Sequence, residues 1–358
     1  MKRMKYVLIL YIILCFLCGC QKTGMTGDKK IPWQDTDFAM GTVIRQNIYT
    51  SQGEELADEV LSKIKQLEGQ ISWRIESSPI AAINENAGGE KAIEVEEKIA
   101  GWLMACQDVY IQSNKALDIT IGPIARLWDI GGEHPKVPSK KEITKLLPLV
   151  DENRIQIKEN MVRFSTKGGQ IDLGAVGKGI ACDEIREFLD EKKQEKDMDT
   201  INGTFSIGGS ILIYGKKPDQ SNWKIGIQNP RGKEGENMGA ISISQEEKGA
   251  RFISTSGDYE KYIEQGKKRY HHIMDPKTGY PSDSGLISVT IISESGFLSD
   301  ALSTACFVAG LEQGKLLAEK YGVQAIFIDQ NKNVYTAGGA EQNLTILEKE
   351  YVLRNETK

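Results

Sequence analysis

The sequence predicts an α+β protein in which mixed antiparallel sheets are flanked by helices. Strand-like segments follow one another from residue 205 to residue 292, without the regular alternation of strand and helix that a doubly wound sheet requires. Helical patterns lie before and after this run, with apolar residues at three- and four-residue spacing. The 36 glycines gather in short turns, which indicates many tight connections.

The first half of the chain is expected to hold most of the helices. Leu56, Val60, Leu61, Ile64 and Leu67 recur at helical spacing. The elements expected here are a strand over 42–49, helices over 54–71 and 94–111, a hairpin formed by 155–157 and 162–165, and a helix over 178–191. A strand is expected to end at Asp172, because apolar Ile171 leads into a Gly-rich turn.

The second half is expected to be rich in strands. These are placed over 205–214, 223–228, 238–244, 251–255, 259–264, 270–274 and 286–292. One long helix over 297–321 follows and ends at Gly322, and strands over 323–328 and 333–336 complete the core.

The N-terminus is typical of a targeting segment. Lys2, Arg3 and Lys5 precede an apolar run over 6–16 that is too short for a comfortable membrane span. The run ends at Leu17-Cys18-Gly19-Cys20, which resembles a bacterial lipoprotein signal with Cys20 as the lipidated mature N-terminus. An uncleaved anchor helix is the alternative. Both place the folded part on the extracytoplasmic face of the membrane. In the lipoprotein interpretation, residues 1–19 are the signal peptide and residues 20–32 a polar tether.

Cysteine usage and net charge argue against a disulfide-stabilised scaffold and against a nucleic-acid-binding protein. Beyond the leader, Cys106, Cys182 and Cys306 are far apart and odd in number, so no disulfide framework is expected and buried thiols are the simplest interpretation. The net charge of −5 offers no basic footprint for a nucleic acid.

Asp300 and Thr304 are four residues apart in a helical segment, so a carboxylate and a hydroxyl share one face. Mg²⁺ prefers oxygen ligands of this kind, together with substrate phosphates. The alternative is a first-turn capping carboxylate followed by a threonine that bonds back to the helix.

The segment Asp172-Leu173-Gly174-Ala175-Val176-Gly177-Lys178-Gly179 could hold a phosphate. Its glycines allow sharp turns, Lys178 could neutralise phosphate oxygens, and the following helix presents its N-terminus to an anion. The spacing matches neither a dinucleotide fingerprint nor a Walker loop. A tight turn with an exposed lysine is the alternative. Together with the Asp300 pair, the segment indicates metal-assisted chemistry at a phosphate.

His271 and His272 lie on a predicted strand and therefore point to opposite faces. Without a His-Glu-x-x-His motif they favour no zinc hydrolase, although one of them could act as a general base. The alternative is one surface histidine and one hydrogen-bonded core histidine.

Two other polar segments are less specific. The sequence around Ser256 has no Gly-x-Ser-x-Gly elbow, so it gives no support to an α/β-hydrolase nucleophile. Asp118 stands among apolar residues and is either a hydrogen-bond hub or a ligand acceptor.

Taken in order, these segments resemble the ApbE family of FAD:protein FMN transferases. The matching segments are Met40-Gly41-Thr42, Ala116-Leu117-Asp118-Ile119-Thr120-Ile121-Gly122-Pro123, the Asp172 to Gly179 segment, Ser206-Ile207-Gly208-Gly209, Thr255-Ser256-Gly257-Asp258-Tyr259, His271-His272-Ile273-Met274-Asp275-Pro276-Lys277-Thr278-Gly279 and Asp300-Ala301-Leu302-Ser303-Thr304. Each is weak alone, but their ordered occurrence over about residues 38–310 is specific.

The resemblance implies an ApbE-like, T-fold-related domain over 33–350, with two subdomains as one possibility and residues 351–358 as a tail. It implies transfer of FMN from FAD to a threonine or serine hydroxyl of a target protein, with release of AMP. Targets in the family include flavin-bearing subunits of Nqr- and Rnf-type redox pumps. Mg²⁺ would be held by Asp300, Thr304 and the carbonyls of Ala175 and Ser303.

The resemblance also assigns contacts with FAD. They fall on Met40, Ala116, Leu117, Asp118, Asp172, Lys178, Ser256, Gly257 and Ile273. The family's tyrosine position corresponds to Arg74, so Trp73 is the residue expected to stack in its place. His272 is the candidate base, Lys178 a second cation, and Asp172 or Asp258 could share the proton transfer.

Three other functions stay open. An FAD pyrophosphatase would use the same site with water as the acceptor. A non-catalytic flavin-binding lipoprotein would need no metal ligands, which disfavours it. A solute-binding lipoprotein would need two α/β lobes, and the strand-rich second half fits that poorly.

Overall fold

The computed structural model describes residues 31–194, 200–233, 235–244, 250–266 and 268–354. The expected signal peptide and Cys20 therefore lie outside the described residues. Within the described part of the chain, no helix combines the length and the apolar character needed to cross a membrane.

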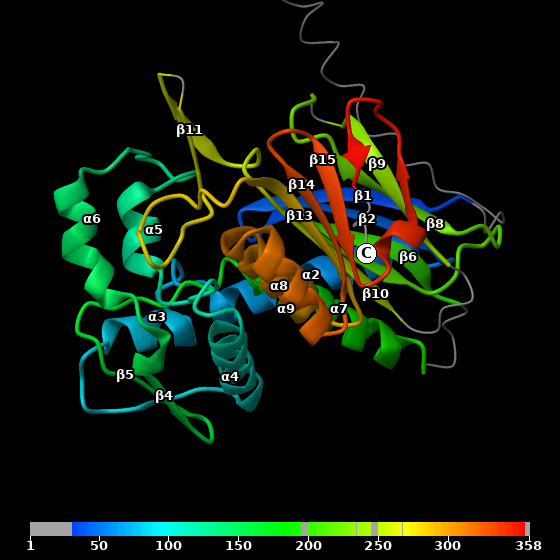
Figure 1. The fold of residues 1–358 in the computed structure, drawn as a ribbon. Helices are drawn as coiled ribbons and strands as arrows, with labels where there is room; N and C mark the ends of the chain where they lie inside the picture. Colours follow the sequence, from blue (N-terminus) through cyan, green and yellow to red (C-terminus); the bar gives the residue numbers. More distant parts are fainter. Residues whose placement is uncertain (1–30, 195–199, 234, 245–249, 267, 355–358) are drawn as a thin grey trace, which may run out of the picture.

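A nine-stranded sheet lies at the right of Figure 1 and forms the core of that part of the molecule. Its strands, in spatial order, are β1 (Trp33–Ala39), β2 (Thr42–Tyr49), β6 (Asn202–Ile207), β7 (Ser210–Tyr214), β10 (Arg251–Gly257), β13 (Leu286–Ser293), β14 (Gln324–Asp329), β15 (Asn333–Ala337) and β17 (Val352–Leu353). Neighbouring strands run antiparallel except β15 and β17, which are parallel. The predicted α+β class is confirmed.

Both faces of this sheet are covered, which explains why all eight residues of β13 are buried. On one face lie the helices α2 (Gly53–Ile71), α7 (Gly177–Lys192), α8 (Gly296–Ala309) and α9 (Leu311–Lys320). On the other lies a three-stranded sheet of β8 (Trp223–Gln228), β9 (Asn237–Ile243) and β16 (Leu344–Ile346). Strand β14 serves both: Ala325 and Phe327 join the core under the helices, and Ile326 and Ile328 join the core under the small sheet.

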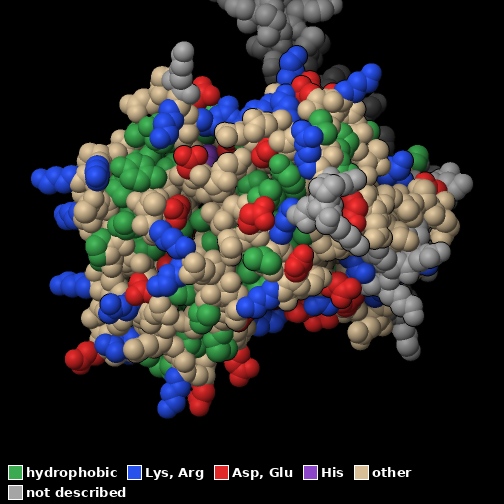
Figure 2. All heavy atoms as spheres, in the orientation of Figure 1, with side chains coloured by type: hydrophobic (Ala, Val, Ile, Leu, Met, Phe, Trp, Pro, Cys, Tyr) green, Lys and Arg blue, Asp and Glu red, His purple; other side chains and the backbone are tan. Residues whose placement is uncertain are grey.

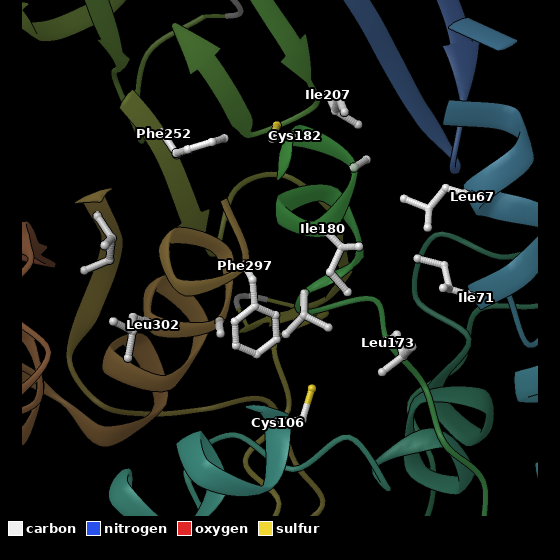
Figure 3. Packing of buried hydrophobic residues seen from close by; sticks show 14 of the residues in the cluster. Leu67, Ile71, Cys106, Leu173, Ile180, Cys182, Ile207, Phe252, Phe297 and Leu302 are labelled. Atoms are coloured by element: carbon white, nitrogen blue, oxygen red, sulfur yellow. The ribbon is translucent and has the colours of Figure 1, made fainter. Parts of the chain in front are cut away.

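The helices pack together through apolar side chains from segments far apart in the sequence. Leu67 and Ile71 of α2, Ile180 of α7 and Phe297 of α8 point into the space between their helices (Figure 3). Cys106, Cys182 and Cys306 are free and buried in this core, as predicted.

The remaining elements extend the molecule to the left in Figure 1. They are α3 (Pro79–Glu85), β3 (Ile93–Glu94), α4 (Glu97–Gln112), α5 (Gly122–Trp128), α6 (Lys140–Leu146), β4 (Ile155–Lys158), β5 (Met161–Phe164) and the hairpin of β11 (Tyr262–Gln265) and β12 (Lys268–His271), with short 3-10 turns at Leu147–Leu149 and Glu152–Arg154. A third 3-10 turn, Ala340–Gln342, packs instead against β14, β15 and β16. Trp128 of α5 packs on Tyr270 of β12 and holds the base of the hairpin. On the side of α6, Lys140, Lys141 and Lys145 are exposed, and Lys and Arg side chains project there in Figure 2.

Two predicted elements are each divided by a glycine. The strand expected over 205–214 is the hairpin of β6 and β7, because Gly208 turns the chain with φ 55°. The helix expected over 297–321 is α8 followed by α9, because Gly310 takes φ 83° between them. In both cases the apolar pattern continues across the break, so periodicity alone did not reveal it.

Other boundaries also differ from prediction. No strand ends at Asp172, where only an isolated bridge joins Gln170 to Ile121. The strand expected over 259–264 begins only at Tyr262, and the strand expected over 270–274 already ends at His271. Residues 255–257, expected as a turn, belong to β10.

Candidate active site

The site depends on a close crossing of α7 and α8. A Cβ atom built at Gly179 would lie 2.1 Å from the carbonyl oxygen of Gly296, and one built at Gly296 would lie 2.3 Å from that of Gly179. The two helix backbones therefore touch at a point where only glycine fits. This contact places the start of α7, with its Gly-rich loop, against the first turns of α8.

Each helix supplies a carboxylate to the N-terminus of the other. Asp300 of α8 accepts a 2.9 Å hydrogen bond from Gly179 N through Oδ2, and Asp183 of α7 accepts from Gly296 N (2.9 Å) and Phe297 N (2.7 Å). Anions are stabilised at helix N-termini, where the backbone N–H groups lack partners. The crossing thus turns the Asp300 side chain toward the Gly-rich loop that the sequence paired with it.

Lys178 and Asp300 form a partly buried ion pair at this crossing. Lys178 Nζ lies 3.3 Å from Asp300 Oδ1, with the lysine side chain 24% and the aspartate side chain 3% exposed. Burial lowers the pKa of Lys178, but the carboxylates of Asp300 and Glu260 outweigh that effect and hold it above its usual value. Lys178 is therefore a cation held next to the carboxylate.

A chain of buried hydroxyls leads to Asp300. Ser210 donates to Asp300 Oδ1 (3.2 Å), Ser254 donates to Ser210 (3.0 Å), and Ser299 lies 2.7 Å from Ser254. Ser299 donates its one proton to the Gly296 carbonyl at 2.8 Å, so the bonds that point toward the carboxylate are those from Ser254 and Ser210. Asp300 ends this chain as an acceptor of hydrogen bonds from Ser210 and from Gly179 N.

A second set of hydroxyls supports Thr304. Ser256 Oγ lies 3.1 Å from Thr304 Oγ1 and 2.8 Å from Ser303 Oγ, and Ser303 donates to the Asp300 carbonyl. If Thr304 donates to Ser256 and Ser256 to Ser303, each proton has an acceptor. A lone pair of the partly exposed Thr304 hydroxyl is then left for a cation.

The Ala175 carbonyl is also available. In a regular first turn it would accept from Gly179 N, but that group donates to Asp300 instead, and no other donor in the described ranges reaches it. Asp300, Thr304 and this carbonyl form an all-oxygen donor set, which fits a hard cation such as Mg²⁺. No group of three or more His, Cys, Asp and Glu in the described chain forms a metal cage. Because Lys178 now contacts both Asp300 oxygens, a cation would have to displace its ammonium group.

Comparison with known proteins identifies the family of this chain. The ApbE family model matches residues 40–327, which is most of the chain. The chain belongs to the ApbE family. It is 28% identical to the FAD:protein FMN transferase of Treponema pallidum (strain Nichols) over 96% of both chains, and 29% identical to that of Klebsiella pneumoniae (strain 342) over 87% of this chain and 94% of the relative.

A solved structure agrees with this assignment. The crystal structure of the ApbE protein from Thermotoga maritima superposes with a TM-score of 0.78 at 29% identity, covering 87% of this chain and 99% of that one. The predicted family is confirmed, and with it the class of enzyme, a transferase.

In this ApbE-family chain the two adjacent histidines have different environments. His271 is buried, donates from Nε2 to the Ser282 carbonyl and accepts from Ile273 N through Nδ1, so it is a neutral core residue. His272 directs Nδ1 to the Lys261 carbonyl at 3.3 Å, which leaves Nε2 as an acceptor. Burial, Lys178, His271 and Lys261 lower the pKa of His272 to about 3, so it is neutral at physiological pH.

The two aspartates expected to share the proton transfer are held by other groups. Asp258 makes a bidentate pair with Arg231, with both N–O distances 2.7 Å, and is therefore fixed as a structural anion. Asp172 accepts from Gly174 N at 2.8 Å, which helps to shape the Gly-rich loop.

Sequence reasoning missed Glu260. Its Oε1 lies 3.0 Å from the position of a Cβ built on Gly209, beside the β6–β7 turn. Burial raises its pKa, Lys178 lowers it and Asp300 raises it, so its carboxylate acts on the same ion pair. Its only sequence signal was an acidic residue two positions after Asp258 in a polar turn.

A pair of buried acids lies next to the Gly-rich loop. Asp118 accepts from Thr120 N (2.8 Å) and Thr120 Oγ1 (2.5 Å), and burial raises its pKa to about 6. Glu152, which the sequence did not single out, is fully buried, and burial and then Asp118 hold its pKa well above the usual value. Ala116 and Leu117 are buried beside Asp118, and Asp172 N donates to the Ile119 carbonyl at 2.7 Å. The predicted 116–118 segment therefore adjoins the loop.

The other predicted flavin contacts lie at different depths. Met40 takes φ 52° in the two-residue turn between β1 and β2, and its Cε lies 3.4 Å from a Cβ built on Gly177. Ser256 and Gly257 end β10, and Ile273 is buried directly after His272. The β1–β2 turn thus reaches the start of α7. Whether these residues touch FAD stays a prediction.

Proposed function

We propose that this chain transfers FMN from FAD to a threonine or serine hydroxyl of another protein, with Mg²⁺ as the metal and AMP as the leaving group. The observation that carries the proposal is the contact of Lys178, Asp300 and the Gly-rich loop across the α7–α8 crossing. It brings a cation, a candidate carboxylate ligand and the Gly-rich loop to one point, as cleavage of a pyrophosphate requires. The names of the relatives from Treponema pallidum and Klebsiella pneumoniae support the same reaction.

Asp300, Thr304 and the Ala175 carbonyl would hold the metal, and Ser303 supports them by its bond to the Asp300 carbonyl. When bound, Mg²⁺ supplies charge neutralisation at the pyrophosphate oxygens. Lys178, released from Asp300, would reach a phosphate oxygen and stabilise the charge that develops on AMP. The acceptor oxygen forms a bond to the FMN phosphorus while the bond from that phosphorus to the AMP oxygen breaks.

The proton of the acceptor hydroxyl would go to Nε2 of His272. That nitrogen carries no proton, because Nδ1 is directed to the Lys261 carbonyl. The low pKa of His272 comes from burial and from the cations Lys178 and Lys261. The negative phosphates of the bound dinucleotide would offset these cations and raise the basicity of His272 in the complex.

The acceptor would be an extracytoplasmic redox protein, of which Rnf- and Nqr-type subunits are examples, and the enzyme would be tethered to the membrane through Cys20. The lipoprotein-like end of the leader supports this location. Hydrolysis of FAD to FMN and AMP is the second candidate, because the same site would serve a water molecule.

The test is incubation of the chain from residue 31 onward with FAD, Mg²⁺ and a domain that carries an acceptor threonine. Mass spectrometry should show the acceptor heavier by one FMN, with AMP in solution. Asp300→Asn should abolish this gain, and Ser221→Ala, in an exposed loop, should not. Free FMN without a modified acceptor would establish FAD hydrolysis instead. If neither a modified acceptor protein nor free FMN is formed, both the transferase and the hydrolase proposals are refuted.

A further inference from the structure

Trp73 lies between two arginines from separate parts of the chain. The guanidinium carbon of Arg126, on α5, is 3.9 Å from the centroid of the indole ring, and that of Arg74 is 4.2 Å away. Guanidinium groups stack on aromatic faces at such distances. The ring expected to stack on the flavin nucleotide therefore already carries two cations, and a substrate ring could stack on it only after an arginine had moved.

The two guanidinium groups lack neutralising partners in the described part of the chain. Neither makes an ion pair or a side-chain hydrogen bond with a described carboxylate. Burial and the nearby charge of Arg74 lower the pKa of Arg126, and Asp172 opposes them. At Phe188, which also faces two cations, Lys192 is paired with Glu59 at 2.9 Å. The Arg74–Arg126 pair thus places two like charges on one ring, with Asp172 acting on Arg126 alone, and an added anion would stabilise their approach.

The pair stands next to the candidate active site. The Cδ1 atom of Ile71, the last residue of α2, lies 3.2 Å from a Cβ built on Gly177 at the start of α7. Trp73 follows two residues later and packs against the main core. Asp172, on the Gly-rich loop, interacts electrostatically with Arg126 and raises its pKa. Arg74 and Arg126 are exposed, so a ligand can reach them from solvent.

We propose that Arg74 and Arg126, held by Trp73, bind the phosphate groups of the dinucleotide substrate. The inference rests on the proposed function, because it places the substrate along the loop from Asp172 to Lys178. A guanidinium group that stacks on an indole leaves its N–H donors pointing outward in its own plane, where they match phosphate oxygens. Trp73 is a positioning residue that fixes both planes.

The geometry gives the pair a role distinct from that of Lys178. Lys178 is bound to Asp300 and depends on a metal to release it. Arg74 and Arg126 pair with no carboxylate among the described residues, so they can meet a phosphate before any metal arrives. Binding of FAD without metal should therefore depend on the arginines and weaken with salt, since each phosphate contact is electrostatic.

The test measures FAD and riboflavin binding by flavin fluorescence, in EDTA and at several salt concentrations, for the chain from residue 31. Arg74→Met and Arg126→Met keep an unbranched side chain on Trp73 but remove the charge. Each should weaken FAD binding about tenfold, which is the usual effect of one lost charge-assisted hydrogen bond, and reduce its salt dependence. Riboflavin, which has no phosphate, should bind as it does to the wild type. Arg354→Met, at an exposed position after β17, is the matched control and should change neither.

The outcomes separate this inference from the proposed function. Equal loss of riboflavin and FAD binding would show that the arginines shape a ring pocket and would overturn the phosphate assignment. Unchanged FAD binding in both variants would also overturn it while leaving the proposed function intact. A wild-type chain that binds no FAD in EDTA would overturn the metal-independent phosphate contact, and one that still binds none after Mg²⁺ is added would refute the proposed function itself.

Discussion

Gly179→Ala tests the helix crossing on which the site depends. The added methyl group would lie 2.1 Å from the Gly296 carbonyl oxygen and 2.7 Å from Asp300 Cβ. Ordinary contact needs α7 and α8 to separate by about 1 Å. Overpacking of this kind typically destabilises by about 1–3 kcal/mol, against a gain in helix propensity of about 1 kcal/mol. We expect a net loss of up to about 2 kcal/mol in the free energy of unfolding.

Urea unfolding followed by circular dichroism measures this loss, and the FMN-transfer assay measures its functional effect. Gly69→Ala on α2 and Gly101→Ala on α4 are matched controls, because a Cβ built at either position meets nothing within 4 Å. Both should be as stable as the wild type or gain up to about 1 kcal/mol. Transfer should fall in Gly179→Ala, because separation stretches the bond from Gly179 N to Asp300. The reasoning fails if Gly179→Ala is as stable and active as these controls.

Three further predictions concern titration and hydroxyl orientation. The pKa of Asp118 is about 6 in the folded state and about 3.9 in the unfolded state. Between these two pH values the unfolded chain releases a proton that the folded chain keeps. The free energy of unfolding should therefore fall by about 2–3 kcal/mol as the pH rises from 4 to 7. Asp118→Asn should shrink that fall in urea titrations, and an undiminished pH dependence would contradict the assignment. Ser256→Ala should weaken Mg²⁺ binding, measured by calorimetry, about tenfold, because it removes the acceptor for the Thr304 proton. Ser221→Ala is the control. Equal Mg²⁺ affinities for the two variants would show that the Ser256–Thr304 hydrogen bond does not support the metal. Because His272 is neutral above pH 4, kcat/KM should show no inflection near pH 6.5, and an inflection that disappears in His272→Gln would disprove the low pKa.

Local patterns in the sequence carried most of the secondary structure. The helix spacing of Leu56 to Leu67 predicted α2 closely, and the strand patterns around Trp223 and Leu286 matched β8 and β13. These patterns are short-range, since burial of one helix stripe or one strand face is written into neighbouring residues. The breaks at Gly208 and Gly310 were missed because apolar residues continue on both sides and only the backbone angle changes.

The sequence by itself determined the family, the α+β class and the shared helical face of Asp300 and Thr304. Spacing along one chain segment was enough for each of these. Only the tertiary structure decided which histidine is buried, that Asp258 belongs to Arg231, and that Glu260 and Arg126 approach the site. The reason is physical: these roles arise from contacts between segments that are apart in the chain and meet only in the folded protein.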